Sequence, residues 1–250
     1  MQCPKAVVFD LDNTLADPHC PVSEEMAARL ERVIAHMPVA VMSAASLERI
    51  EQDVVARLRK TDLARLSLFA ANAAQAYTYR DGAWHAQYRH GFTDQDRPVI
   101  KSVLEEVAKE LGILEHRAPY GAQFIDYEGY LAFTALGIDA PVEERRRWDP
   151  NGEKRKKMQS LLQEKLPDVD IFIGGLTTID ITPKGINKSH GVMWYAQTLG
   201  ILPQDMLYVG DALYEGGNDA AVLPTGIQTR ATSGPSETLA IIEDLLAACS

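Results

Sequence analysis

The sequence alternates short apolar segments with longer helix-like segments at both of its ends, and this alternation stops in the middle. Near the N-terminus, segments of strand length such as AVVFD at 6–10 are each followed by a helix-like segment. The same pattern returns from Lys188, around the apolar segment MLYVGD. Strands that alternate with helices predict a mostly parallel α/β sheet. We therefore expect a Rossmann-like, doubly wound α/β core built from two separate parts of the chain.

The middle of the chain predicts a different architecture. A hairpin is expected around Asp81-Gly82 and a second turn near Glu128-Gly129, and a charged helix at about 153–165 leads into VDIFIGGLTTIDITP. Antiparallel strands mixed with helices indicate an α+β insertion. The expected organisation is a core formed by residues 1–80 and 184–250, with an inserted cap at residues 81–183.

Three of the predicted core strands end in polar side chains. In open α/β sheets, ligands bind beyond the carboxyl ends of the strands, so we expect these side chains to meet there. Lys188, which opens a helix, adds a cation to the same region. The polar residues are Asp10, Asp12, Thr14, Ser43, Asp211, Asn218 and Asp219.

Carboxylates gathered at one edge of a sheet need a cation, and ligation by oxygen alone favours Mg²⁺. A metal on Asp10 and Asp211 keeps Asp10 ionised and allows it to attack an electrophile. Asp12, two residues further on, is suited to donating and recovering a proton. Lys188, Ser43 and the metal are expected to hold the phosphate oxygens. The pattern predicts phosphoryl transfer through an aspartyl-phosphate.

DLDNTLA at 10–16, Ser43, Lys188 and GDALYEGGND at 210–219 resemble the four motifs of the haloacid dehalogenase (HAD) superfamily of Mg²⁺-dependent phosphotransferases. The order of the motifs fits across nearly the whole chain. The insertion is similar to the C2-type caps of subfamily IIB, which includes sugar phosphatases and eukaryotic-type phosphomannomutases. GDALYEGGND and GGLTTIDITPKGINK look most like the phosphomannomutase branch.

The resemblance implies a role for each matched residue. Asp10 would be the nucleophile, Asp12 the general acid/base, and Thr14, Ser43 and Lys188 phosphate-binding residues. Thr178 and Asp180 match contacts to sugar hydroxyls. The metal environment would comprise Asp10, Asp12 through its carbonyl, Asp211, Asn218 and Asp219. For Asn218 and Asp219, capping of the following helix is the alternative role.

The sequence departs from the phosphomannomutase pattern where arginines are expected. His19 stands in place of a core arginine, and Tyr127, Ala132 and Ile138 stand where arginine, asparagine and arginine are expected in the cap. Without arginines, a sugar bisphosphate is difficult to hold while it reorients. We therefore expect a Mg²⁺-dependent phosphatase that acts on a small phosphomonoester such as a sugar phosphate. The alternatives are a hexose phosphomutase and, less favoured, a phosphate-binding regulatory protein without turnover.

The composition of the chain argues against several classes of binding partner. A net charge of −10 argues against a nucleic-acid or anionic-membrane surface, and no apolar run approaches the ~18 residues of a membrane span. Cys3, Cys20 and Cys249 show no C-x-x-C spacing, which argues against a disulfide framework and suits a cytoplasmic protein. The expected partner is a small phosphate ester bound by a monomer or homodimer.

Overall fold

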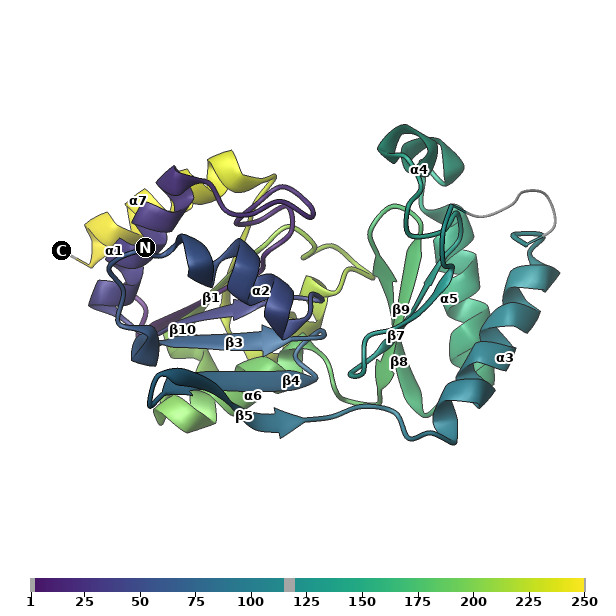
Figure 1. Ribbon diagram of the computed structural model, residues 1–250, viewed down its shortest axis with the longest axis horizontal. Coiled ribbons are helices and arrows are strands. Elements are labelled where there is room, and N and C mark those ends of the chain that lie inside the picture. Colours follow the sequence, from purple (N-terminus) through teal and green to yellow (C-terminus); the bar gives the residue numbers. More distant parts are fainter. Residues whose placement is uncertain (1–2, 115–119, 250) are drawn as a thin grey trace. The chain divides into compact units, whose positions relative to one another are not determined.

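The chain forms two compact units in the computed structural model, which describes residues 3–114 and 120–249. The core unit comprises Met1–Arg89, Asn187–Glu215 and Asp219–Ser250, and the cap unit comprises His90–Ile186 and Gly216–Asn218 (Figure 1). The chain thus leaves the core, builds a second unit and returns, which is the discontinuous arrangement that the sequence predicts.

A seven-stranded sheet forms the centre of the core unit, in the order β11-β10-β1-β2-β3-β4-β5. The first five of these strands are parallel, while β4 and β5 run antiparallel at one edge. This sheet confirms the predicted α/β core. The strands are β1 (Ala6–Phe9), β2 (Val39–Met42), β3 (Leu66–Ala70), β4 (Gln75–Arg80), β5 (Ala83–Arg89), β10 (Met206–Gly210) and β11 (Gln228–Ala231).

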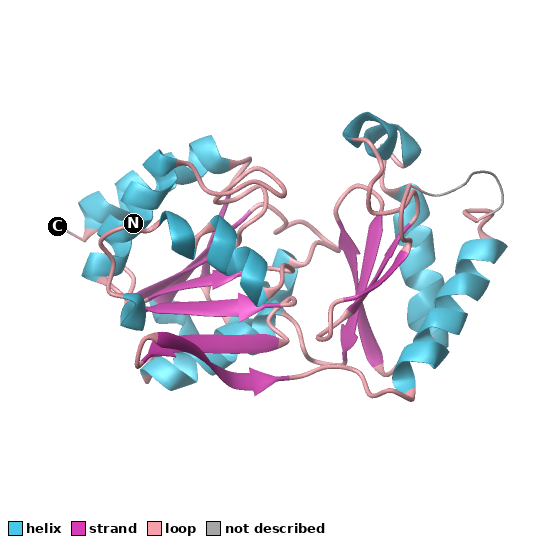
Figure 2. Cartoon of the chain, in the orientation of Figure 1, coloured by secondary structure: helices cyan, strands magenta, loops and turns pink. Residues whose placement is uncertain are grey.

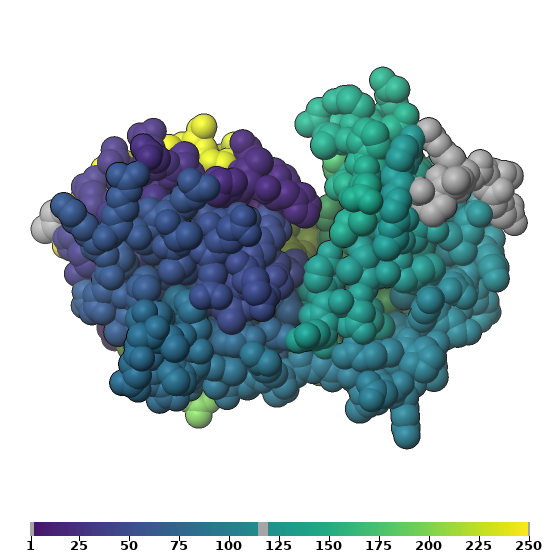
Figure 3. Space-filling model, viewed as in Figure 1, coloured from purple at the N-terminus to yellow at the C-terminus, as the bar shows by residue number. Residues whose placement is uncertain are grey.

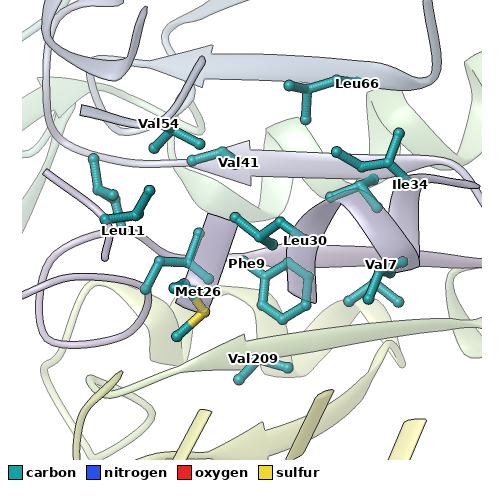
Figure 4. Packing of buried hydrophobic residues seen from close by; sticks show 14 of the residues in the cluster. Val7, Phe9, Leu11, Met26, Leu30, Ile34, Val41, Val54, Leu66 and Val209 are labelled. Atoms are coloured by element: carbon teal, nitrogen blue, oxygen red, sulfur yellow. The ribbon is translucent and has the colours of Figure 1, made fainter. Parts of the chain in front are cut away.

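Helices cover both faces of this sheet, because successive side chains of a strand point to opposite faces. Val7 and Phe9 of β1 pack in one apolar cluster with α1, as Figure 4 shows, whereas Val8 lies in a second cluster with α6. The sheet is therefore doubly wound. The helices of the core unit are α1 (Glu24–His36), α2 (Leu47–Asp53), α6 (Lys188–Leu199), α7 (Pro235–Ala248) and the 3₁₀ turns η1 (Val55–Arg57), η2 (Leu63–Arg65), η3 (Pro203–Asp205) and η4 (Asp219–Thr225).

Two helices near the N-terminus test the local predictions. Ser23 followed by Glu24 and Glu25 predicts the N-terminus of a helix, and Ser23 does cap α1, since its hydroxyl accepts a hydrogen bond from the Met26 amide at 3.1 Å. The sequence also predicts a helix from Leu47 to about Lys60, which is too long, because α2 ends at Asp53 and gives way to η1. The β-branched pair Val54-Val55 at this junction disfavours continued α-helix.

The cap unit is an antiparallel sheet with helices on one of its faces (Figure 2), which confirms the predicted α+β insertion. Its strand order is β6-β7-β9-β8. Leu104 of α3 and Met158 and Leu162 of α5 bury themselves against Phe133 in the sheet. The elements are α3 (Asp96–Glu110), β6 (Phe124–Asp126), β7 (Leu131–Thr134), α4 (Val142–Trp148), α5 (Glu153–Lys165), β8 (Val169–Gly174) and β9 (Thr178–Pro183).

The boundaries between the units differ from those expected. The hairpin at Asp81-Gly82 forms as predicted, but its second strand, β5, pairs with β4 and extends the core sheet. Tyr77 and Trp84 pack on the core cluster, which explains why the hairpin stays with the core. The cap unit therefore begins after Arg89 instead of residue 80, and it ends at Ile186 instead of residue 183. It also gains Gly216–Asn218, since Gly217 forms a bridge with Ile173 of β8.

The two ends of the core unit are joined by a disulfide between Cys3 and Cys249, which corrects the expectation that the cysteines form no disulfide framework. Spacing along the chain gave no sign of this bond, because 246 positions separate the two residues and only the fold brings them together. Cys20 is free and exposed. Among the described residues, no helix combines the length and the apolar character that crossing a membrane requires.

Reducing this disulfide is expected to lower the free energy of unfolding by about 2–5 kcal/mol, because a cross-link over a long loop restricts the unfolded chain. The measurement is urea unfolding with and without a thiol reductant, and Cys3→Ser should reproduce the effect of reduction. Cys20→Ser is the matched control and should leave the midpoint unchanged. Equal midpoints for reduced and oxidised protein would contradict this role of the bond.

Candidate active site

Asp10 lies at the carboxyl end of β1, in the centre of the core sheet. Its amide donates to the Val209 carbonyl at 2.9 Å, which continues the pairing of β1 with β10 by one residue. The next residues form a tight turn in which Asn13 has φ 59°, a left-handed conformation that asparagine tolerates better than most residues. Buried Leu11 and Leu15 anchor this turn in the core cluster. The turn therefore holds Asp10 at the edge where ligands bind in such sheets.

Lys188 is the first residue of α6 and is fully buried. Its Nζ donates to Asp10 Oδ1 at 2.7 Å and to Asp219 Oδ1 at 2.5 Å. Burial alone would lower the pKa of Lys188, but the two carboxylates outweigh it and the pKa is raised. Lys188 therefore stays charged, and it ties together the ends of β1 and β10, which the sequence predicted would meet.

Three carboxylates, from Asp10, Asp211 and Asp219, have ligand atoms that all lie within 4.8 Å of one another. Burial raises the pKa of Asp10 to about 8, with Lys188 opposing this and Asp219 and Asp211 adding to it. Burial and Asp219 raise the pKa of Asp211 to about 6, against the lowering effects of Lys188 and an Asn13 hydrogen bond. Three carboxylates thus face one ammonium group, and the cluster is short of positive charge.

A divalent cation fits this deficit, because hard metals prefer carboxylate oxygens. Asp219 is already engaged: Oδ1 accepts from Lys188 and Tyr208, the latter at 2.5 Å, and Oδ2 accepts from the Ala212 amide at 2.9 Å. Asp10 Oδ2 has no hydrogen bond to the residues that the structure describes. The donor set therefore fits a metal held by Asp10 and Asp211, with Asp219 serving Lys188.

Asp12 is not part of this cluster. Both of its oxygens are bound by Arg49 of α2, with Nη1 3.0 Å from Oδ2 and Nη2 2.5 Å from Oδ1. The His19 amide also donates to Asp12 Oδ1 at 3.0 Å. Asp10 and Asp12 therefore contact cations from two different helices, α6 and α2, which belong to different apolar clusters. The two carboxylates of the Asp-x-Asp motif are thus held by different cations.

Ser43 and Thr14 lie close to the strand ends where the sequence placed them. The Ser43 amide donates to the Phe69 carbonyl at 2.9 Å, which extends the pairing of β2 with β3, and its hydroxyl accepts from the Ala45 amide at 3.0 Å. Thr14 is fully buried, and its hydroxyl has no hydrogen-bond partner among the described residues. Both are thus held by the core, and the roles assigned to them stay predictions.

Three of the predicted site residues, Thr178, Asp180 and Asn218, belong to the cap unit. Ile179 and Ile181 of β9 face the cluster formed with α3 and α5, so Thr178 and Asp180 lie on the opposite face of the cap sheet. Asp180 is 5% exposed. Asn218 also belongs to the cap unit, whereas its neighbour Asp219 belongs to the core unit and opens η4.

The three cap positions where basic or amide side chains were expected carry none. The Tyr127 ring stacks on Tyr130 with centroids 4.7 Å apart, Ala132 is buried in β7, and Ile138 is partly exposed. A guanidinium nevertheless lies beside position 138, because Arg145 of α4 donates a hydrogen bond to the Ile138 carbonyl. In the sequence, Arg145 is the first of three consecutive arginines, a run more typical of a solvated helix face than of a binding site.

Arg49 and Tyr208 contact the carboxylates of the site, although the motifs in the sequence do not include them. A signal for Arg49 exists, since its spacing from Asp53 is that of an ion pair on one helix face, directly after the Ser43 strand end. No comparable signal exists for Tyr208, whose hydroxyl lies on the buried face of β10 and bonds Asp219. Its neighbours on the strand are as apolar as itself, so the sequence alone predicts only packing.

Tyr208→Phe is expected to lower turnover of a phosphate ester by about 3- to 10-fold and the free energy of unfolding by about 1–3 kcal/mol. The reason is that Asp219 loses one of its donors and then holds Lys188 less firmly. Tyr77→Phe is the matched control, because that buried hydroxyl donates to a neutral acceptor, Gln75 Oε1, at 2.8 Å. It should cost less stability and leave turnover unchanged. Equal turnover in both variants would show that Asp219 holds Lys188 well enough for turnover without the hydrogen bond from the Tyr208 hydroxyl.

Comparison with solved structures finds proteins of the same fold. An IMP-nucleotidase of Plasmodium falciparum superposes with a TM-score of 0.74 at 17% identity, covering 98% of this chain and 68% of that one. A haloacid dehalogenase-like hydrolase of Bacteroides thetaiotaomicron superposes with a TM-score of 0.63 at 14% identity, covering 97% of this chain and 99% of that one. The fold and the motifs at its strand ends define a protein of the HAD superfamily.

The particular family follows from the sequence. The eukaryotic phosphomannomutase profile matches residues 26–248, and the chain belongs to this family. Phosphomannomutase of Spinacia oleracea is 26% identical over 220 residues, which cover 85% of this chain and 83% of the relative. These findings confirm the predicted superfamily and the phosphomannomutase-like branch.

Proposed function

We propose that this protein is a Mg²⁺-dependent phosphatase that hydrolyses a small phosphomonoester, a sugar phosphate, through an aspartyl-phosphate (an acyl phosphate) formed on Asp10. The observation that carries the proposal is the position of Asp10, at the end of β1 with one oxygen on buried Lys188 and the Asp211 carboxylate close by. A carboxylate held in this way is suited to nucleophilic attack on phosphorus.

Two steps make up the proposed reaction. In the first, a carboxylate oxygen of Asp10 bonds to phosphorus as the bond to the ester oxygen breaks, and Asp12 donates a proton to that leaving oxygen. In the second, Asp12 takes a proton from a water molecule whose oxygen attacks phosphorus, and the bond to Asp10 breaks. Inorganic phosphate leaves, and both carboxylates return to their starting states.

Asp10 and Asp211 are the residues that would hold Mg²⁺, and the bound ion would supply positive charge to the phosphoryl oxygens and keep Asp10 ionised. Lys188 adds a second positive charge at Asp10. Ser43 and Thr14 are proposed phosphate contacts, and Thr178 and Asp180 are proposed contacts to the organic part of the substrate. A cytoplasmic location belongs to the same proposal. The Cys3–Cys249 disulfide is more typical of proteins in oxidising compartments. The proposed cytoplasmic location can therefore be tested separately, by locating the protein in cells.

A hexose phosphomutase is the second candidate, and family membership is the observation that favours it. Against it stand Tyr127, Ala132 and Ile138, which offer no cationic side chain for a second phosphate. Arg145 weakens this objection to a phosphomutase, because its guanidinium lies beside the Ile138 carbonyl and places one cationic group in that part of the cap unit.

The product of a hexose 1-phosphate separates the two candidates. We expect purified protein with Mg²⁺ to release inorganic phosphate from a panel of sugar phosphates, and a chelator to abolish this release. Conversion of the 1-phosphate to the 6-phosphate without phosphate release would overturn the phosphatase proposal in favour of the mutase. Neither product from any member of the panel would favour the regulatory alternative. Arg145→Ala is informative in the mutase case, where it should reduce isomerisation.

A further inference from the structure

Arg49 holds two carboxylates with different parts of its guanidinium group. Nε donates to Asp53 Oδ2 at 3.0 Å, and the edge formed by Nη1 and Nη2 grips both oxygens of Asp12. The helix positions the arginine for both, since Asp53 lies one turn further along α2 and the Arg49 amide is capped by Ser46 Oγ at 3.3 Å. Paired N–H donors in one plane suit any anion with two adjacent oxygens.

The two ends of this arrangement differ in their exposure to solvent. The Asp53 side chain is 10% exposed, whereas Asp12 is 28% and Arg49 is 24% exposed. Figure 3 shows the segment around α2 at the surface of the core unit. The Asp53 end is also tied to the loop that follows Asp12, because the Val22 amide donates to the Asp53 carbonyl at 2.9 Å. The contact with Asp53 is thus the anchored end and the contact with Asp12 the accessible one.

The grip on Asp12 conflicts with the task proposed for that residue. A carboxyl group that passes a proton to a leaving oxygen must bring one of its own oxygens to it. Both Asp12 oxygens are occupied by Arg49, and Oδ1 also accepts from the His19 amide. Asp12 therefore has to leave Arg49 before it can act, and the vacated guanidinium edge then needs another anion.

We propose that Arg49 exchanges ligands when substrate binds, releasing Asp12 and taking the phosphoryl group of the ester on the same edge while Asp53 keeps hold of Nε. This rests on the proposed function, because only a phosphate ester at Asp10 gives the released Asp12, once it has taken a proton from solvent, a leaving oxygen to protonate. The phosphoryl group presents adjacent oxygens with a greater charge than a carboxylate, so it competes well for two parallel N–H donors. Arg49 thereby couples the arrival of substrate to the release of the proton carrier.

Equilibrium binding of inorganic phosphate tests the exchange without any turnover. With Mg²⁺ present, Arg49→Ala is expected to weaken phosphate binding by about 10- to 100-fold, as for a lost charge-assisted hydrogen-bond pair. Arg49→Lys, which keeps the charge but not the paired donors, should fall between this variant and wild type. The matched control is Arg57→Ala, which removes an exposed arginine eight positions further along the chain and should leave binding unchanged.

Two further measurements separate exchange from a merely structural role. In hydrolysis of an aryl phosphate, Arg49→Ala should raise KM as well as lower kcat, and added guanidinium ion should restore part of the loss. If Arg49 only holds Asp12 in place, phosphate affinity and KM stay at the wild-type values and only kcat falls, and that result would overturn the proposal. A third outcome is that the protein hydrolyses no ester but still binds phosphate, and binds it more weakly when Arg49 is replaced. That result would reject the proposed function and keep Arg49 as a phosphate ligand.

Discussion

Asp10→Asn is expected to reduce turnover of any accepted phosphate ester by about 10⁴-fold or more, because the amide cannot serve as the nucleophile. The change is nearly isosteric and removes one of three carboxylates that face a single lysine, so the fold should tolerate it. The substituted amide still offers an oxygen to the Lys188 ammonium, which in the wild-type chain donates to Asp10 at 2.7 Å. The measurement is phosphate release in the presence of Mg²⁺, with the thermal unfolding midpoint of the variant recorded beside it.

Asp17→Asn is the control for this experiment, because Asp17 is an exposed aspartate in the loop that follows this turn, seven positions further along the chain. It should keep wild-type turnover. If Asp10→Asn kept more than about a tenth of the wild-type rate while remaining folded, Asp10 would not be the group that attacks phosphorus. Slow recovery of activity on long incubation would point to deamidation of the new asparagine, and mass spectrometry of the protein would identify it.

Residues at the ends of buried strands could be predicted from the sequence. Asp10, Ser43 and Asp211 each follow a short apolar run, and such runs take few structures other than a buried parallel strand. Once the strands are placed, the geometry of a parallel sheet brings their carboxyl ends to one edge. Local capping was predictable for the same reason, as at Ser23, because the signal and its effect lie within one helical turn.

Contacts over long distances in the sequence could not be predicted in this way. The Arg49–Asp12 ion pair spans 37 positions and the Cys3–Cys249 bond 246, and each depends on how whole elements pack. The hairpin that ends in β5 shows the same limit. Its turn was readable from Asp81-Gly82, but the sheet that it joins is decided by the packing of Tyr77 and Trp84. The periodicity of a sequence indicates whether a segment forms a helix or a strand, but it does not indicate which other helices or strands that segment packs against.

Lys188→Met is the second variant with a large expected effect, and it acts on both stability and turnover. The methionine keeps most of the volume of the lysine but leaves Asp219, which is fully buried, facing Asp10 without a cation. Loss of one partner of a buried ion pair typically costs about 3–5 kcal/mol. Turnover should fall by about 10³-fold, the usual effect of removing a group that stabilises charge in the transition state. Urea unfolding in the presence of a chelator measures the first effect, and phosphate release with Mg²⁺ measures the second.

A double variant identifies the origin of the lost stability. If the unpaired Asp219 charge causes it, adding Asp219→Asn to Lys188→Met should restore about 2 kcal/mol or more, because the buried negative charge disappears. Turnover should not recover, since the ammonium group at Asp10 is still missing. The Ala212 amide, which now donates to Asp219 Oδ2 at 2.9 Å, can donate to the oxygen of the new amide. The Tyr208 hydroxyl, which now donates to Oδ1 at 2.5 Å, can accept a hydrogen bond from the new NH₂ group. If the free energy of unfolding stays low in the double variant, the loss comes from altered packing around α6. If turnover recovers, Lys188 has no role in the proposed reaction.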